Sequence, residues 1–359
     1  MNRRDFVKTT TLALFGARLY GAAKKPRTVI TIFQRGAVDG LNMIVPYGER
    51  AYYDARPTIA IPRDQVLDLD GFFGAHPSLQ SLLPLWKNRS LAVIHAAGSP
   101  DATRSHFDAQ DFMESGTPGI KSTRDGFLAR ALAARTGGAK LRAVSLTQTM
   151  PRIFAGSQDA IATPDITKFG NAMTAKVFAS MYPEAFEAAR VLQSVQAAST
   201  AAYPRNPLGN SLQQLARLIK SDIGLELAFT DVGGWDTHAG QNTPLANNLR
   251  GFAEAIAAFA NDLGSRMHDV TVVTTSEFGR TVRENGNRGT DHGHGTVMLV
   301  LGGGVKGGMH GPWPGLGREQ LFEGRDLAIT TDFRDVFAEV LGVNVFPGHK
   351  ARPVRFSAS

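Results

Sequence analysis

The 359-residue chain contains no cysteine, and its other shortages are as informative. Without a thiol, the chain can have no disulfide, no cysteine nucleophile, no iron–sulfur cluster and no cysteine-ligated zinc. No stretch reaches the roughly 18 apolar residues that span a bilayer. The formal charge of +7 is small and dispersed, which gives no indication of nucleic-acid binding. A hydrophobic content of 43% with 20% charged residues is instead typical of a globular protein with a sizeable core.

The N-terminus has a composition of its own. The pair Arg3-Arg4, followed by Phe6 and Lys8, resembles a twin-arginine export signal, and a modest apolar run follows it. An N-terminal amphipathic helix is the alternative interpretation. We expect residues 1–23 to be an export signal read by the twin-arginine translocase. Its removal takes away four basic side chains and one acidic side chain, so the formal charge falls from +7 to +4.

The rest of the chain alternates between short β-branched runs and longer helical patterns. Such alternation predicts one α/β domain over residues 24–359, with a mostly parallel sheet covered by helices on both faces. The expected strands are 28–33, 91–95, 142–146, 225–230, 270–274 and 297–301. The expected helices are about ten residues from Ser105, and 172–198, 206–220 and 245–267.

Two groups of acids and histidines point to a metal site. Asp291, His292 and His294 lie within four residues and are separated or flanked by glycines, which permit irregular backbone. Asp236 and His238 form a second pair upstream. Carboxylate and imidazole groups are ligands for divalent cations, and two such groups among only nine histidines favour one shared site over a polar surface loop.

Most polar candidates follow the ends of predicted strands. Ligands of open α/β sheets bind outside the carboxyl ends of the strands, so these side chains are expected at one edge. They are Asp39 after the first strand, Ser105 and His106 after the second, Asp236 and His238 after the fourth, and Glu277, Arg280, Asp291, His292 and His294 after the fifth.

The order and spacing of these segments resemble the family known as domain of unknown function 1501. The resemblance is carried by residues 33–42, 103–108, 234–238, 276–281 and 289–295, and it extends over residues 28–345. More remotely, the chain is similar to the alkaline phosphatase and sulfatase superfamily. That likeness implies an alkaline phosphatase-like fold holding one or two divalent metal ions, and a hydroxyl that attacks a phosphate or sulfate ester. Histidine and carboxylate ligands are compatible in part with zinc, manganese, iron or calcium, and zinc, manganese and calcium are the candidates.

Carried over to this chain, the superfamily pattern gives Asp39, Asp236 and His238 as metal ligands. The superfamily commonly has Asp-His directly after a strand like 270–274, where this chain has Glu277 instead. Either an insertion separates that strand from Asp291 and His292, or Glu277 replaces the aspartate and residues 291–294 supply later ligands. Both alternatives keep Glu277, Asp291, His292 and His294 near the site. His310 is a further candidate for an outer ligand, whereas His76 and His95 are interpreted as structural.

The position of the superfamily nucleophile falls near Ser105. A hydroxyl at a helix N-terminus is assisted by the helix dipole, and the alternative for Ser105 is a plain N-cap, a role that serine fills very often. Counting back from Gly116 selects His106 instead, which would act as a ligand or an acid. Arg280 and Arg35 are candidates for holding an anionic ester, since guanidinium matches phosphate or sulfate bidentately, with a salt bridge as the alternative for each.

Together these features predict an exported, periplasmic or cell-surface, metal-dependent hydrolase of a phosphate or sulfate ester. Its partner would be an anionic small-molecule or polymer ester, with no nucleic acid and no membrane span in the mature chain. The alternative is a non-catalytic exported protein of the same fold that contains a metal and serves in binding or assembly.

Overall fold

The computed structural model describes residues 28–172 and 183–357 of the chain. The export signal expected at residues 1–23 lies outside these ranges and stays a prediction. Within them, no helix has both the length and the apolar character needed to cross a membrane.

The centre of the molecule is a mixed sheet that the sequence predicted in outline. Nine strands of the described residues form it, and β12 (Thr331–Asp332) pairs with β5 alone. The other eight follow one another in the spatial order β11 (Gly308–His310), β5 (Leu91–Gly98), β10 (Thr296–Gly302), β9 (Val270–Thr275), β1 (Thr28–Gln34), β8 (Leu227–Val232), β6 (Ala143–Ser145) and β7 (Ala160–Ala162). A small antiparallel sheet contains β2 (Ile44–Val45), β4 (Gly74–Ala75) and β3 (Leu67–Asp68).

Strand β10 runs opposite to the rest of the sheet. It is antiparallel to β5 and to β9, whereas β1 is parallel to β8 and β9, and β6 is parallel to β8 and β7. The mostly parallel sheet is therefore confirmed. Because β10 is reversed, its amino end lies at the edge where the parallel strands end, so residues that precede β10 and residues that follow β9 share that edge.

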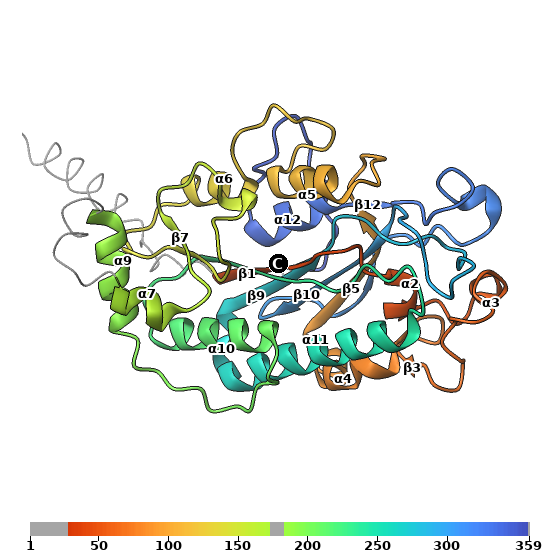
Figure 1. Cartoon of the computed structure of the whole chain (residues 1–359), viewed down its shortest axis with the longest axis horizontal. Helices are drawn as coiled ribbons and strands as arrows, with labels where there is room; N and C mark the ends of the chain where they lie inside the picture. The colour runs from red at the N-terminus through yellow and green to blue at the C-terminus, as the bar shows by residue number, and fades with distance from the viewer. Residues whose placement is uncertain (1–27, 173–182, 358–359) are drawn as a thin grey trace, which may run out of the picture.

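Helices cover both faces of the sheet (Figure 1). One face packs on α10 (Pro207–Lys220), α11 (Asn242–Leu263) and α4 (Leu83–Lys87), and the other on α5 (His106–Ser115), α6 (Phe127–Ala133) and α12 (Phe333–Leu341). Alternate β1 side chains enter the two cores: Ile30 and Ile32 point to the first face, and Val29 and Phe33 to the second. This period of two follows from the strand pleat.

The remaining elements lie at the ends of the sheet and in the connections. They are α2 (Gly40–Met43), α3 (Arg50–Ala55), η1 (Pro77–Leu82), η2 (Arg152–Phe154), α7 (Ile166–Ala172), α9 (Pro183–Gln193), η3 (Gly264–Asp269) and η4 (Arg318–Gln320).

The predicted helices differ from the observed ones mainly at their ends. The prediction of one helix over 172–198 falls partly outside the described residues, and α9 ends at Gln193. The helix expected over 245–267 is α11, which ends at Leu263 because Gly264 follows with a φ of +53° and the chain continues as a 3-10 turn. The helix expected over 206–220 is α10, where Asn206 accepts a hydrogen bond from the Gly209 amide at 2.7 Å as N-cap.

The connection from β9 to β10 folds back on itself. Gly293 donates from its amide to the Gly279 carbonyl at 2.8 Å, and Thr281 donates to the Asp291 carbonyl at 3.0 Å, so the two segments lie antiparallel. A Cβ atom on Gly293 would lie 2.4 Å from the Arg280 carbonyl carbon, and one on Gly279 would lie 1.9 Å from the Gly295 oxygen. Only glycine permits this approach, which returns Asp291 and His292 to the carboxyl edge of the sheet.

Candidate metal centre

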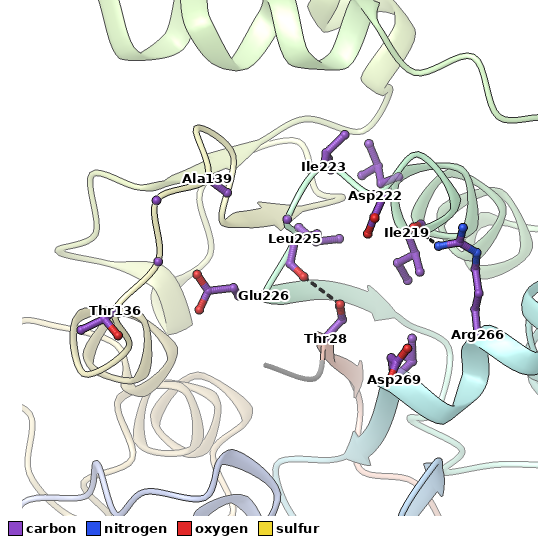
Figure 2. A pocket seen from close by; sticks show the side chains of 15 residues that line it. Thr28, Thr136, Ala139, Ile219, Asp222, Ile223, Leu225, Glu226, Arg266 and Asp269 are labelled. Atoms are coloured by element: carbon purple, nitrogen blue, oxygen red, sulfur yellow. Dashed lines mark hydrogen bonds between the residues drawn. The ribbon is translucent and has the colours of Figure 1, made fainter. Parts of the chain in front are cut away.

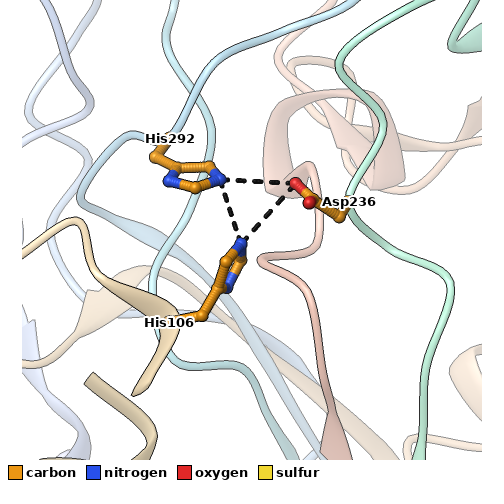
Figure 3. Close-up of side chains that lie close together, drawn as sticks. All are labelled: His106, Asp236 and His292. Atoms are coloured by element: carbon orange, nitrogen blue, oxygen red, sulfur yellow. Dashed lines mark hydrogen bonds and ion pairs between the residues drawn. The ribbon is translucent and has the colours of Figure 1, made fainter. Parts of the chain in front are cut away.

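Three histidines and one aspartate converge at the carboxyl edge of the parallel strands. His106 is the first residue of α5, Asp236 and His238 follow β8, and His292 precedes β10. His292 Nε2 lies 3.0 Å from the Nε2 atoms of both His106 and His238. Asp236 Oδ1 lies 3.0 Å from His238 Nε2. It also lies 3.3 Å from His292 Nε2 and 3.6 Å from His106 Nε2 (Figure 3). The sequence-predicted residues of this group are thus brought together.

Each imidazole is held by its other nitrogen. His106 Nδ1 donates to Glu277 Oε1 at 2.8 Å, and His292 Nδ1 donates to the Arg104 carbonyl at 2.8 Å. His238 Nδ1 lies 3.2 Å from Asp291 Oδ1. A neutral imidazole that donates from Nδ1 has only a lone pair on Nε2, so three lone pairs point to one place. An acceptor on the outer nitrogen is the usual arrangement around a metal-binding histidine.

The converging atoms fit a cation. Facing lone pairs about 3 Å apart repel one another unless a positive charge lies between them. The five separations of 3.0–3.6 Å span the roughly 3.3 Å expected between ligand atoms of a tetrahedral ion with bonds of about 2.0–2.1 Å. The ligand atoms of His106, Asp236 and His292 all lie within 4.8 Å of one another. His106, Asp236 and His292 therefore fit a single divalent ion, and His238, whose Nε2 lies 3.0 Å from two of these ligand atoms, is the candidate for a fourth ligand.

Glu277 lies outside this ring of ligand atoms. It is buried, and its Oε1 accepts from His106 Nδ1, from Gln110 Nε2 at 2.9 Å and from the Gly36 amide at 2.8 Å. Burial by itself raises the pKa of the Glu277 carboxyl, but the hydrogen bonds from His106 and Gln110 outweigh it and hold that pKa below its usual value. In turn, the bond to Glu277 raises the pKa of His106, which makes this imidazole a stronger base.

Asp291 is the hydrogen-bond partner of His238 Nδ1, as Glu277 is of His106 Nδ1. Its Oδ1 accepts from Asn285 Nδ2 at 3.0 Å as well as from His238. The hydrogen bond from Asn285 lowers the pKa of the Asp291 carboxyl, and the one from His238 adds to the effect, so the group is anionic at neutral pH. Glu277 and Asp291, which the sequence suggested as ligands, thus lie as hydrogen-bond partners of His106 and His238.

Arg280 is buried at the centre of the loops that carry the site. Its guanidinium donates to the carbonyl groups of Gly36, Ala37, Trp235 and Thr290 at 2.7–3.1 Å, and its Nη2 lies 2.5 Å from Asp236 Oδ1. Burial raises the pKa of Asp236, but the hydrogen bond and charge of Arg280 outweigh it and keep that pKa low. These contacts use the guanidinium to fasten three loops together and to fix the Asp236 carboxylate.

Asp39 is placed in a separate buried cluster. Its Oδ2 accepts from Arg56 Nη1 at 2.7 Å and from Gln241 Nε2 at 2.5 Å, and its Oδ1 caps α2 through the Leu41 and Asn42 amides. Gln241 in turn accepts from the hydroxyls of Thr237 and Thr290 at 3.0 Å and 2.6 Å. Asp39 therefore supports the two ligand-bearing loops through Gln241.

The remaining candidates have contacts of other kinds. Ser105 is the N-cap of α5, where its Oγ accepts from the Asp108 amide at 3.4 Å. The His294 ring stacks on Phe322 with centroids 4.0 Å apart, and His310 Nε2 donates to the Lys306 carbonyl at 2.7 Å. Arg35 pairs with Asp231 at 2.6 Å and Glu114 at 2.9 Å.

Sequence reasoning missed two residues beside the site. Arg325 is partly exposed and its Nη2 donates to the His292 carbonyl at 2.5 Å, while the buried Asp326 binds both Arg325 and Arg104. No spacing or composition signal marks this Arg-Asp pair, which lies over thirty residues from His292 in the chain.

A cavity of about 410 Å³ lies at the opposite edge of the sheet, near the amino ends of β1, β8 and β9 (Figure 2). Thr28, Leu225 and Val270 line it together with Glu226 and Arg266. None of its lining residues is a histidine, and it does not include any of the converging side chains. The cavity is therefore distinct from the metal centre.

Solved structures of the expected superfamily are similar to this chain at a low level. The C-terminal periplasmic domain of EcEptC from Escherichia coli, in complex with Zn, is 11% identical with a TM-score of 0.40, and 79% of this chain and 74% of that one are covered. A protein in the alkaline phosphatase superfamily from Vibrio parahaemolyticus is 11% identical with a TM-score of 0.39, and 80% of this chain and 62% of that one are covered. The PsFucS1 sulfatase from Pseudoalteromonas sp. is 11% identical with a TM-score of 0.39, and 96% of this chain and 72% of that one are covered.

No curated protein matches the chain. The model of a family described as protein of unknown function (DUF1501) matches residues 86–355, which is well over half of the chain and includes all four converging residues. The chain belongs to the DUF1501 family.

Proposed function

We propose that this protein is an exported, metal-dependent hydrolase of phosphate or sulfate esters. The observation that carries the proposal is the convergence of the Nε2 atoms of His106, His238 and His292 on Asp236 Oδ1, with each outer nitrogen already bound to an acceptor. Burial lowers the pKa of His292, which favours the neutral imidazole that a metal requires.

The donor set bears on the kind of ion. Three imidazole nitrogens and one carboxylate oxygen suit zinc and other transition metals better than calcium, which prefers six to eight oxygen ligands. Among the candidates of the sequence analysis, zinc therefore fits best and manganese second. When bound, such an ion supplies Lewis-acid polarisation of an ester oxygen and stabilises the charge that develops during hydrolysis.

Arg325 is our candidate for holding the anionic group of the substrate. All three arginines bind carbonyl and carboxylate groups, but the Arg280 side chain is buried and that of Arg35 is 25% exposed, whereas the Arg325 side chain is 44% exposed. It contacts the His292 carbonyl, and its charge contributes to the lowered pKa of Asp291 on the open side of the site. A partly exposed guanidinium whose Nε and Nη2 are fixed by Asp326 and the His292 carbonyl keeps Nη1 to donate to a phosphate or sulfate group.

The place of Ser105 favours water as the attacking group. The hydroxyl is exposed and accepts a bond from the Asp108 amide, as an ordinary N-cap does, and no contact joins it to the four ligand residues. The same observation favours the second candidate function, a non-catalytic metal-containing binding protein, because that protein needs no nucleophile.

The experiment measures hydrolysis of a panel of esters by the exported protein, purified without chelator. Phosphate and sulfate esters are assayed with wild type, with Arg325→Met, and with Arg318→Met as a matched control, since Arg318 is exposed in the same segment. With Zn²⁺ in excess, so that the metal site is occupied in every variant, we expect KM to rise about tenfold or more in Arg325→Met, from the loss of a charge-assisted pair, with little change in the control. If the fully metallated wild-type protein hydrolyses none of these esters, the hydrolase proposal is wrong and the non-catalytic binding function is supported.

Export is tested separately. Changing Arg3 and Arg4 to lysine should leave the chain in the cytoplasm if the twin-arginine translocase carries it, as cell fractionation would show. Undiminished export of that variant would contradict the proposed signal.

A further inference from the structure

Asp326 is a fully buried carboxylate that neither the ligand set nor the proposed chemistry uses. It lies between η4 and β12, where its backbone pairs with Phe322 and with Thr281. Thr281 is also paired with Asp291 through the Thr281 amide, so Asp326 is anchored to the folded-back segment that carries His292. Its backbone is thus fixed relative to the site.

The Asp326 side chain joins two arginines. Its Oδ2 accepts from Arg104 Nη2 at 2.7 Å and Nε at 3.2 Å. Its Oδ1 accepts from Arg325 Nε at 2.9 Å, and Arg325 Nη2 lies 3.0 Å from Oδ2. One buried negative charge therefore holds two guanidinium groups that would otherwise repel each other.

Both arginines also hold His292, from opposite ends of that residue. The Arg104 carbonyl accepts the Nδ1 hydrogen of the His292 ring at 2.8 Å, and Arg325 Nη2 donates to the His292 carbonyl at 2.5 Å. The ring orientation and the backbone position of His292 are therefore fixed by two residues that meet at Asp326.

We propose that Asp326 is a positioning residue for the metal centre, acting on His292 through Arg104 and Arg325. Loss of its charge releases both arginines, so that the His292 ring can turn about its Cβ–Cγ bond and its Nε2 leaves the ligand position. Removing an outer partner of a ligand typically weakens metal binding 10–100-fold. The inference rests on the proposed function only in requiring that the four converging atoms bind a cation.

The test compares Asp326→Asn with Glu323→Gln in the full chain. Glu323 is the matched control because it is exposed and binds Arg104 Nη2 at 2.6 Å without contacting Arg325. The readouts are the Zn²⁺ dissociation constant, from competition with a chelator, and the visible absorption spectrum of the Co²⁺-substituted protein. We expect 10–100-fold weaker Zn²⁺ binding and shifted Co²⁺ bands in Asp326→Asn, and wild-type values within twofold in Glu323→Gln.

If Asp326→Asn does not fold, Arg325→Met removes one of the two connections at a partly exposed position. It should weaken Zn²⁺ binding and shift the Co²⁺ bands in the same direction, without substrate in the assay. Wild-type affinity and spectrum in the asparagine variant would overturn the inference, and so would a lower melting temperature with unchanged metal affinity. A wild type that binds neither ion would overturn the metal centre and this inference together.

Discussion

Asp39 and Asp236 are two acids in matching places with opposite surroundings. They follow the neighbouring parallel strands β1 and β8, and each has an arginine partner. The Asp39 side chain is 1% exposed and both its oxygens accept hydrogen bonds, from Arg56, Gln241 and two backbone amides. The Asp236 side chain is 47% exposed, and its Oδ1 faces three imidazole nitrogens as well as Arg280.

This difference shows what the strand order does and does not determine. Parallel strands bring both acids to one edge, but the partners that reach each carboxylate decide whether it has lone pairs to offer. Both carboxylate oxygens of Asp39 accept hydrogen bonds that stabilise the fold, whereas Oδ1 of Asp236 faces the histidine nitrogens. Four substitutions test this difference.

The largest effect is expected from Asp39→Asn. The substitution leaves the Arg56 guanidinium, which is fully buried, without its counter-charge. Removing one partner of a buried ion pair typically costs about 3–5 kcal/mol in the free energy of unfolding, which urea denaturation would measure. The fraction that folds should still bind metal. Normal stability combined with loss of metal would instead make Asp39 a ligand.

Asp236→Asn should have the complementary effect. We expect Zn²⁺ binding to weaken at least about 100-fold, because the one anionic ligand is removed. The loss of stability should be smaller than for Asp39→Asn, since Arg280 keeps its bonds to four carbonyl groups. Isothermal titration with Zn²⁺ measures the first quantity and urea denaturation the second. Unchanged affinity would remove Asp236 from the ligand set.

The third prediction concerns His95, a histidine outside the site, and the pH dependence of stability. His95 is buried in β5, its Nε2 bonded to the Ile44 carbonyl at 2.9 Å and its Nδ1 to the Ala96 amide at 3.0 Å. Burial lowers the pKa of His95 to about 4. The unfolded chain, with a pKa near 6.5, takes up this proton first. The resulting stability is complete above pH about 6.5 and is lost as the pH falls to about 4.

That loss amounts to about 3 kcal/mol over the interval. Urea denaturation across this pH range, beside an NMR titration of the His95 ring, checks the prediction. The variant His95→Gln, which keeps a donor and an acceptor but does not titrate, should show a shallower pH dependence. An equal slope in both proteins would assign the acid sensitivity to other groups.

The smallest effect is expected from Ser105→Ala. If the hydroxyl only caps α5, stability falls by about 1 kcal/mol, and metal content and ester hydrolysis remain. Thermal unfolding and the ester assay are measured on the same preparation. Abolished hydrolysis with full metal content would instead establish Ser105 as the nucleophile.

The sequence was sufficient for the parts of the fold that depend on local pattern. The β-branched runs predicted β1, β5, β8, β9 and β10, and the rule that ligands bind at the carboxyl edge of α/β sheets led to the group that includes His106, Asp236 and His292. A short strand has no sequence signal for its direction. The reversal of β10, which explains how residues after β9 and before β10 share one edge, came only from the structure.

The roles of individual side chains were harder to predict, because they depend on partners far away in the chain. Glu277 became the partner of His106 across 171 positions, and Gln241 reached Asp39 across 202. Whether a carboxylate near a strand end faces a cation or a histidine Nδ1 is decided by ring orientation, which spacing does not encode. Arg325 and Asp326 lie in an ordinary polar loop sequence, so nothing marked them in advance.

We expect three imidazoles and Asp236 to bind one divalent ion. X-ray absorption spectroscopy of the zinc-loaded full chain tests it most directly, because imidazole rings give a distinct multiple-scattering pattern. We predict one ion per chain with three imidazole nitrogens near 2.0 Å and one or more oxygens, and two imidazoles in His292→Ala. An ion surrounded by oxygen alone, or the same three imidazoles after removal of His292, would contradict the account.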